Sequence, residues 1–562
     1  MPKTSDQPSQ FRILCRVFWL RVVDLEVLSP DNDARTLLGH LAALLAGVSV
    51  LFTAPVILIG GPIAEPDLWT FEHCFFATTL TVVGVLAVLS WDSALPDRRD
   101  LLVLGPLPVR IRTVFAAKLS ALAGVLSFSV VALNFSSGLI WPFLFSVPGS
   151  GILGALRSIV AYWTTSAAGA IFIFCCVLCL QGTAALVLPR QLFLRISSFL
   201  QVIAFTTLFA GYLLEPSLES IPALSNSSNQ RLLDCLPSYW ILGLFQQLNG
   251  TMRPAFVLLA RRAWIALAIA FLSAVALLLL AWVLKLRRVV EQPDIVPGRR
   301  ASGKLLSCGT TVSTAILQFG VRSLLRSRQH RLLYAFYLSV GLAIALLYAN
   351  VTQAHPNALA HSGDLPASYL VASLMIISFA VLGLRIIIAI PVALRANWIF
   401  QLTQIDATGT YLSAARRVLL VLAVVPIWVA TAAVMLCYST SWRTVAHLIA
   451  LGFVGAILAD GAILNLRKLP FTCSYLPGQA KLHFLFWGGI LVGLPVINEA
   501  GLLEHRLLAT GFGAVEVLAL LLSMTLLMHW YNGHWRLDTT TMIFEEEEPL
   551  GVLALKLNSW VS

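Results

Sequence analysis

The most regular pattern along the chain is a succession of apolar runs, each about as long as a bilayer is thick. About twenty apolar residues in a helix suffice to cross the hydrocarbon core. We therefore predict an all-α polytopic membrane protein with about twelve transmembrane helices. The predicted spans are 36–60, 70–91, 113–138, 154–188, 194–214, 258–284, 332–349, 367–394, 417–437, 445–465, 483–500 and 508–530.

A strongly basic stretch between Leu284 and Leu332 interrupts this succession and leaves six predicted spans on either side. Each half has a basic stretch before its first span and a long basic loop after its second. These landmarks recur at an offset of about 300 residues. The predicted organisation is a first six-span half (1–290), a cytoplasmic basic linker (291–312), a second six-span half (313–530) and a cytoplasmic acidic tail (531–562).

The basic stretch before each half has its own periodicity. In the second half the apolar residues recur on one helical side and polar residues on the other, which predicts a helix lying in the membrane surface. The apolar side holds Leu317, Val321, Leu324 and Leu325, and the polar side holds Gln318, Arg322, Arg326 and Gln329. Residues 11–28 show the same tendency less regularly. We expect a cytoplasmic interfacial helix before each half.

Composition supports the membrane interpretation. Hydrophobic residues make up 58% of the chain and charged residues 12%, which excludes an ordinary soluble globular protein. The net charge of +11 follows from the positive-inside rule, because most Lys and Arg residues fall in segments on one side of the predicted topology. We therefore expect a multi-pass protein of the cytoplasmic or inner membrane with both termini cytoplasmic, and no nucleic-acid partner.

The nine cysteines do not indicate a metal or redox site. Their number is odd, and most lie in or beside apolar runs without the paired spacing of metal ligands. We predict neither disulfides nor a metal centre.

The loop from Trp91 to Ala121 is the most specific sequence in the chain. A charged turn of Asp97, Arg98, Arg99 and Asp100 precedes a short apolar helix that starts at Leu101. The sequence Gly-Pro-Leu-Pro at 105–108 then forces a bend, after which a helix restarts and becomes the third span. This pattern predicts a short helix held beneath the bilayer.

That arrangement resembles the coupling helix of ABC transporter permeases of the type-two exporter superfamily. The matching residues are Asp100, Leu101, Leu102, Leu107, Pro108, Arg112, Ala117 and Lys118. In the second half only the layout matches, because the loop 395–420 has no Leu-Pro pair. The resemblance implies that the charged turn together with Leu101, Leu107, Pro108, Arg112 and Lys118 receives force from an ATPase.

A second segment, Leu236–Gly250, resembles the outer segment that these permeases carry before their sixth span. Pro237, Trp240 and Gly243 match the family pattern. The resemblance implies an outer re-entrant helix. An aromatic belt at the end of a span is the alternative interpretation.

The resemblance implies a fused permease of two six-span halves that forms a translocation pathway and catalyses no reaction itself. The expected partners are cytoplasmic ABC ATPase subunits in two copies, with ATP and magnesium bound there, the lipid bilayer, and a substrate that the sequence does not identify. Gly298–Lys304 matches a phosphate-binding loop in spacing only, because Leu305 stands where a hydroxyl should meet magnesium. We therefore expect no cofactor in this chain.

Ionisable residues within predicted spans are candidate functional residues, since an unpaired charge in the hydrocarbon core costs at least about 2.5 kcal/mol. Asp460, Glu516 and Arg385 are the candidates. They either find partners locally or at the membrane edge, line a polar pathway, or pair between spans.

Two other function classes stay open. A secondary transporter also commonly has six plus six spans, although the sequence predicts no buried charged pairs of the kind that ion coupling uses. A membrane-embedded transferase would need clustered Asp, His or Glu at a membrane face. The outer loops are expected to offer only scattered candidates, namely His355, His361, Asp364, Glu504 and His505.

Overall fold

The computed structural model of the protein describes residues 10–23, 34–59, 65–91, 103–104, 106–147, 149–216, 218, 220–291, 311–353, 366–390, 408–464, 471 and 481–534. These residues are 89% helical and contain no strand, so the predicted all-α class is confirmed. The chain divides into two compact units, Met1–Arg300 and Ala301–Ser562. Most of the predicted linker and tail lies outside the described residues.

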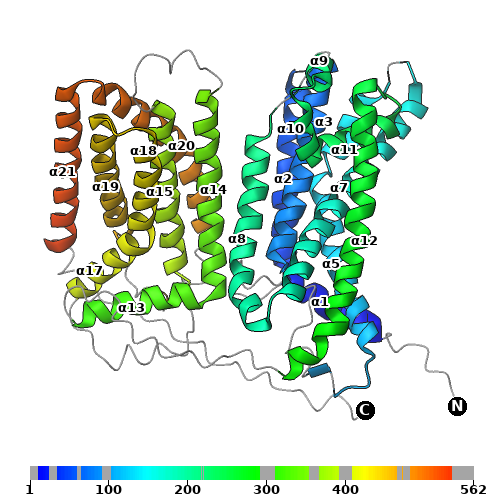
Figure 1. Ribbon diagram of the computed structural model, residues 1–562, viewed down its shortest axis with the longest axis horizontal. Coiled ribbons are helices and arrows are strands. Elements are labelled where there is room, and N and C mark those ends of the chain that lie inside the picture. Colours follow the sequence, from blue (N-terminus) through cyan, green and yellow to red (C-terminus); the bar gives the residue numbers. More distant parts are fainter. Residues whose placement is uncertain are drawn as a thin grey trace, which may run out of the picture. The chain divides into compact units, whose positions relative to one another are not determined.

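The first unit contains six long helices, a helix that precedes them and several short ones (Figure 1). Its helices are α1 (Gln10–Val23), α2 (Ala34–Ile59), α3 (Glu65–Leu89), α5 (Ile111–Leu133), α6 (Ser137–Phe145), α7 (Gly151–Val187), α8 (Arg190–Leu214), α9 (Ile221–Ser225), α10 (Gln230–Cys235), α11 (Pro237–Asn249) and α12 (Pro254–Glu291).

The second unit has a similar order of long helices. They are α13 (Thr311–Arg326), α14 (Arg328–Gln353), α15 (Ala367–Ile388), α17 (Thr408–Leu419), the π-helical turn η4 (Leu420–Val424), α18 (Val425–Tyr438), α19 (Trp442–Ala462), α20 (Lys481–Leu508) and α21 (Gly511–His534). The amphipathic α13 runs across the foot of α14 and α15 rather than alongside them, as expected for a helix in the membrane surface (Figure 1).

Nine helical stretches in the described residues are long and apolar enough to cross a membrane. They lie on α3, α5, α7, α12, α14, α15, the continuous α17–η4–α18, α19 and α21. The other three predicted spans also lie on helices, namely α2, α8 and α20. The multi-pass membrane fold is therefore confirmed, whereas the number twelve stays a prediction.

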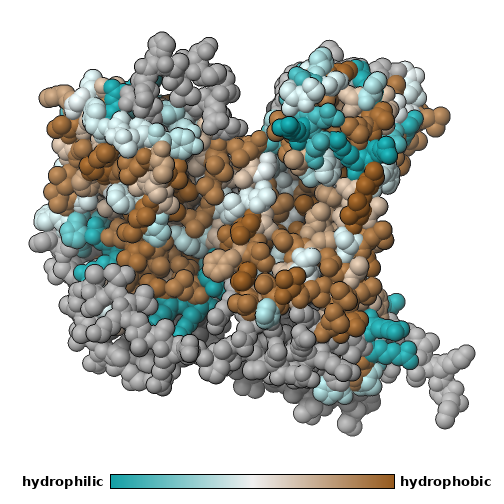
Figure 2. All heavy atoms as spheres, in the orientation of Figure 1, coloured by the Kyte–Doolittle hydropathy of each residue, from teal (hydrophilic) through white to brown (hydrophobic). Residues whose placement is uncertain are grey.

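The exterior of both units is apolar along the sides of these helices (Figure 2). Ile152, Val187 and Val283 are each at least 75% exposed, and so is Phe512 in the second unit. In water such contiguous apolar surface would be unfavourable, but acyl chains solvate it at no cost.

The two cores are built from different side chains. The first unit buries a cluster of rings that includes Phe76, Trp141, Tyr162 and Phe245. Tyr162 also donates to the side-chain oxygen of Asn134 at 2.7 Å and so joins α7 to the end of α5. The second unit buries mainly Leu, Ile, Val and Ala, with Phe471 as the only ring fully inside its main cluster of described residues.

The third long helix of the second unit is regular except at η4, where one turn is π-helical. A π-turn leaves one carbonyl without its usual partner inside the helix. At this turn Tyr334 of α14 donates its hydroxyl to the carbonyl oxygen of Leu422 at 3.0 Å. The irregular turn is thus fixed by a contact from the first long helix of the same unit.

Several helices are longer than the predicted spans. The α7 helix is continuous over 37 residues. The α20 helix continues to Leu508, beyond the predicted end at residue 500. Glu504 and His505, expected in an outer loop, are therefore helical.

Candidate functional site

The predicted coupling loop is described from its bend onward. Asp97, Arg98, Arg99, Asp100 and Leu101 lie outside the described residues. The predicted bend is present: the Leu107 amide donates to the Leu104 carbonyl at 3.1 Å, and α5 starts at Ile111. Leu107 is 50% exposed, and Pro108 and Arg112 are also exposed. The bend therefore presents an apolar tip directly before the third span.

Lys118 is not exposed with the rest of this segment. It is 6% exposed, and its Nζ lies 5.4 Å from the centroid of the Phe18 ring on α1. Such a contact between a cation and an aromatic face stabilises by about 0.5–2 kcal/mol, more when the cation is desolvated. Lys118 therefore holds the surface helix α1 against α5.

Close packing reinforces this junction of α1 with α5. A Cβ added to Gly124 would lie only 2.1 Å from Cζ3 of Trp19, so glycine is required there. Cys15 Sγ contacts the carbonyl oxygen of Ala117 at 3.7 Å. Burial against α5 also raises the pKa of the Cys15 thiol.

The second unit has an equivalent junction between its surface helix α13 and α17. Arg417 Nη1 donates to Ser313 Oγ at 2.8 Å. A Cβ on Gly320 would lie 3.0 Å from Cγ2 of Val418, so the two helices approach closely. The predicted loop before α17 lies outside the described residues, apart from the residues of α17 itself.

A groove of about 600 Å³ opens beside α13. It is lined by Ala315, Gln318, Phe319, Arg322, Ser323, Arg326 and Ser327. Arg322 and Arg326 are both exposed and one helical turn apart, as the amphipathic pattern predicts. The polar side of this surface helix is therefore basic and accessible.

The predicted outer segment is the helix α11, which is largely buried among α3, α7 and α12. Pro237 occupies its first position, where a missing amide hydrogen costs nothing. Trp240 Nε1 donates to the Leu233 carbonyl at 2.7 Å. A Cβ on Gly243 would lie 2.7 Å from that of Leu259, so Gly243 allows α11 to pack tightly on α12.

Next to α11 lies a polar cluster that the sequence analysis did not single out. Glu72 of α3 is 3% exposed and accepts a hydrogen bond from Gln246. On the next residue, His73 Nε2 lies 3.2 Å from Glu215 and 3.1 Å from Ser238 Oγ. Glu215 directly follows α8, so this cluster connects the second and fifth long helices of the unit.

A second cluster of the same residue types lies in the second unit. His447 of α19 contacts Ser373 Oγ at 2.8 Å through Nε2 and Glu504 at 2.7 Å through Nδ1. Ser373 lies on α15 and Glu504 on α20, again the second and fifth long helices. Burying a paired carboxylate stabilises only when its partners stay in place.

The successive contacts from serine to histidine to glutamate are also those of hydrolase triads. Ser373, however, is 3% exposed, and its hydroxyl lies 2.6 Å from the Leu370 carbonyl, to which it donates. The Ser373 oxygen is therefore closed to a substrate, and the cluster binds helices together.

The three ionisable residues predicted inside spans have different environments. Asp460 is completely buried and forms a bidentate ion pair with Arg416, at 2.6 and 3.1 Å. Arg385 Nε donates to the Ala462 carbonyl at 2.5 Å. Glu516 is exposed on α21. The sequence did not reveal this pair between the partly buried Arg416 and the fully buried Asp460.

Metal binding finds no support among the described residues, where no group of three His, Cys, Asp or Glu side chains could hold an ion. Gly298–Lys304 lies outside the described residues. Comparisons with protein-family models, curated proteins and solved structures give no match to this chain.

Proposed function

We propose that this chain is the membrane permease subunit of an ATP-driven ABC exporter. One observation carries the proposal. In each unit a surface helix is fixed to the foot of the third long helix, through Lys118 and Phe18 in the first unit and through Arg417 and Ser313 in the second. In the first unit this foot directly follows the bend with the exposed Leu107 and Pro108.

The packing explains how force applied at the loop would reach the bilayer. A push on the bend moves α5, and the buried Lys118 and the Trp19–Gly124 contact make α1 move with it. Packed interiors transmit displacement because their compressibility is low. The moving part is thus a pair of helices rather than a loop. Alternating access between the two sides would follow from rearrangement of such pairs.

The partners in this proposal are two cytoplasmic ATPase subunits that bind ATP and magnesium. The chain itself provides the pathway through the membrane, with both termini cytoplasmic. The transported substrate is not specified by any described side chain.

Binding and hydrolysis measurements test the proposal. The tagged chain is purified from native membranes together with its ATPase subunits and reconstituted in liposomes. The variants R98E/R99E and L107D should weaken ATPase binding about tenfold and lower coupled ATP hydrolysis accordingly. The control R231E/R261E makes the same charge change at two exposed arginines of α10 and α12, outside the loop, and should leave hydrolysis unchanged. Normal hydrolysis in both loop variants would contradict the proposal.

A secondary transporter is the second candidate, because ionisable side chains inside the membrane, such as those of the pairs Arg416–Asp460 and His447–Glu504, often line ion or substrate pathways in such proteins. Transport driven by a proton gradient in liposomes without ATP would favour it over the ABC permease.

A further inference from the structure

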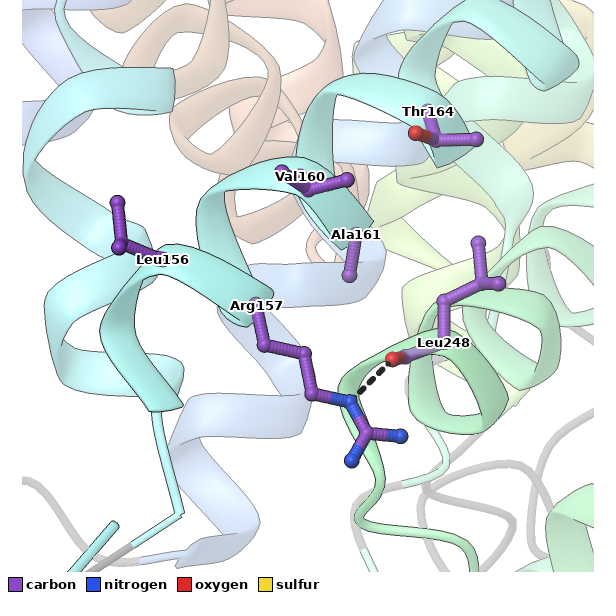
Figure 3. A pocket seen from close by; sticks show the side chains of 6 residues that line it. All are labelled: Leu156, Arg157, Val160, Ala161, Thr164 and Leu248. Atoms are coloured by element: carbon purple, nitrogen blue, oxygen red, sulfur yellow. Dashed lines mark hydrogen bonds between the residues drawn. The ribbon is translucent and has the colours of Figure 1, made fainter. Parts of the chain in front are cut away.

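A groove of about 300 Å³ lies on the first unit where α7 passes the end of α11. Figure 3 shows its lining: Leu156, Arg157, Val160, Ala161, Thr164 and Leu248. All but Arg157 and the hydroxyl of Thr164 present hydrocarbon. The groove opens to the outside, where Leu156 is 53% and Val160 64% exposed. In a membrane its mouth faces acyl chains.

Arg157 is held in place at one end of this groove. Its Nε donates to the Leu248 carbonyl at 2.8 Å, which satisfies an oxygen in the last turn of α11 (Figure 3). Gly250, with a φ of 88°, ends that helix. A Cβ at Gly250 would lie 2.5 Å from Nη1 of Arg157, so the glycine makes room for the guanidinium.

The outer part of the guanidinium is available to a ligand. Among the described residues, no carboxylate lies within ion-pair distance of Arg157, and its only hydrogen bond is the one made by Nε. Nη1 and Nη2 are side by side, as an anionic oxygen pair requires. The cation therefore has a fixed position but no counter-charge from the described part of the chain.

The position of Arg157 along α7 places it near the membrane interface. The 37 residues of α7 extend over about 55 Å, whereas the hydrocarbon core is about 30 Å thick. Arg157 is six residues, or about 9 Å, from the start of this helix, so a core centred on the helix would leave Arg157 just outside the hydrocarbon. Lipid headgroups occupy that depth, and a cation beside exposed apolar side chains is stabilised there by a phosphate.

We propose that this groove binds one anionic phospholipid, with its phosphate on Nη1 and Nη2 of Arg157 and an acyl chain along Leu156, Val160 and Leu248. The charge favours an anionic headgroup, and the apolar lining favours a lipid over a soluble phosphate. The bound lipid would join α7 to the end of α11. This inference is independent of the transport function, because it needs only a membrane-inserted chain.

Lipid-dependent stability of the full chain tests the proposal. The purified protein is titrated with dioleoylphosphatidylglycerol or dioleoylphosphatidylcholine in detergent micelles, and thermal unfolding and bound lipid by native mass spectrometry are recorded. Phosphatidylglycerol should raise the unfolding temperature more than phosphatidylcholine. R157Q should weaken phosphatidylglycerol binding about tenfold. The matched control R231Q removes an exposed cation outside the groove and should behave like the original chain.

Two further variants and a soluble phosphate test the contacts of the acyl chain and of the headgroup phosphate separately. V160W fills the groove mouth and should also weaken phosphatidylglycerol binding, although Arg157 is intact. R157K keeps the charge but loses the paired Nη donors, so it should bind phosphatidylglycerol more weakly than the original chain and more tightly than R157Q. Glycerol 3-phosphate should not stabilise the protein.

Three results would contradict the proposal. Equal stabilisation of R157Q and R231Q by phosphatidylglycerol would show that Arg157 only caps α11. Unchanged phosphatidylglycerol binding in V160W would show that the acyl chain does not lie in the groove. Stabilisation by glycerol 3-phosphate as large as that by phosphatidylglycerol would identify a soluble anion instead of a lipid.

Discussion

The junction between surface helix and third long helix includes a closely packed glycine in both units, but its polar contact is a lysine over an aromatic ring in the first unit and an arginine–serine hydrogen bond in the second. In the first unit, Lys118 lies over the Phe18 ring and Gly124 packs against the Trp19 ring. In the second unit, Arg417 hydrogen-bonds Ser313 of the surface helix, and the preceding Arg416 pairs with Asp460 of α19. The same helices meet in both units although the side chains differ. The two units therefore share the arrangement of these helices, whereas the side chains that join the helices differ.

The clusters of His, Glu and Ser show the opposite relation. Both units connect their second and fifth long helices with these residue types, but the histidine comes from the second helix in the first unit (His73) and from the fourth in the second (His447). Here similar chemistry is reached from different positions. Substitutions can therefore distinguish what each unit depends on.

The largest effect should come from breaking the buried ion pair of the second unit. R416M leaves the fully buried Asp460 without its counter-charge and should destabilise the protein by about 3–5 kcal/mol. The double variant R416M/D460L removes both charges and should recover most of that loss. Thermal unfolding in detergent measures both. If the double variant is no more stable than R416M, the loss in R416M does not come from the unpaired charge of Asp460.

Overpacking the ring junction of the first unit should have the next largest effect. G124V forces a side chain into the Trp19 ring and should cost about 3 kcal/mol. G320A meets the Val418 methyl at 3.0 Å and should cost less, because a methyl can shift. G211A, with nothing within 4 Å, is the control. Equal unfolding temperatures for G124V and G211A would contradict the close approach of α1.

Removing one carboxylate should have an intermediate effect. E504L leaves the buried His447 without its Nδ1 partner and should destabilise by about 2 kcal/mol. Together with H447L it forms a double-mutant cycle, whose coupling energy is read from urea or thermal unfolding. Additive losses would mean that the two side chains do not interact.

The smallest effect on stability should come from Lys118. K118M removes the contact with the Phe18 ring but keeps the aliphatic stem, so the loss should be about 1 kcal/mol. Under the proposed function, coupled ATP hydrolysis in K118M should fall by more than the loss of folded protein explains. K481M, which changes a lysine at the start of α20, is a control for the loss of charge. Hydrolysis that follows stability alone would argue against force transfer through this residue.

Local features of the fold were predictable from the sequence. The apolar runs place a helix in each of the twelve predicted ranges, because about twenty apolar residues specify a membrane helix without tertiary information. The Gly-Pro-Leu-Pro bend was predictable for the same reason: proline restricts its own backbone and that of the preceding residue.

Pairing between helices was not predictable in this way. Asp460 was recognisable as an ionisable residue inside a span, but its partner Arg416 is 44 residues earlier and looks like an ordinary charge at a membrane edge. Glu72 and His73 lie at the start of the predicted span 70–91, and Glu215 directly follows the predicted span 194–214. Polar residues are common at such ends, so these positions gave no sign of the cluster.

The π-helical turn η4 has a consequence for the angular phase of the third helix in the second unit. Arg416 below it and Trp428 above it both bind α19, to Asp460 and to the Leu448 carbonyl. They are twelve residues apart, which in a regular helix would turn them about 120° from each other, whereas the residue absorbed by the π-turn reduces this to about 20°. Deleting one residue between 420 and 424 would therefore convert the π-turn to regular α-helix and leave both side chains facing α19, whereas inserting one residue in a regular part of the helix between them would turn one of them away by about 100°.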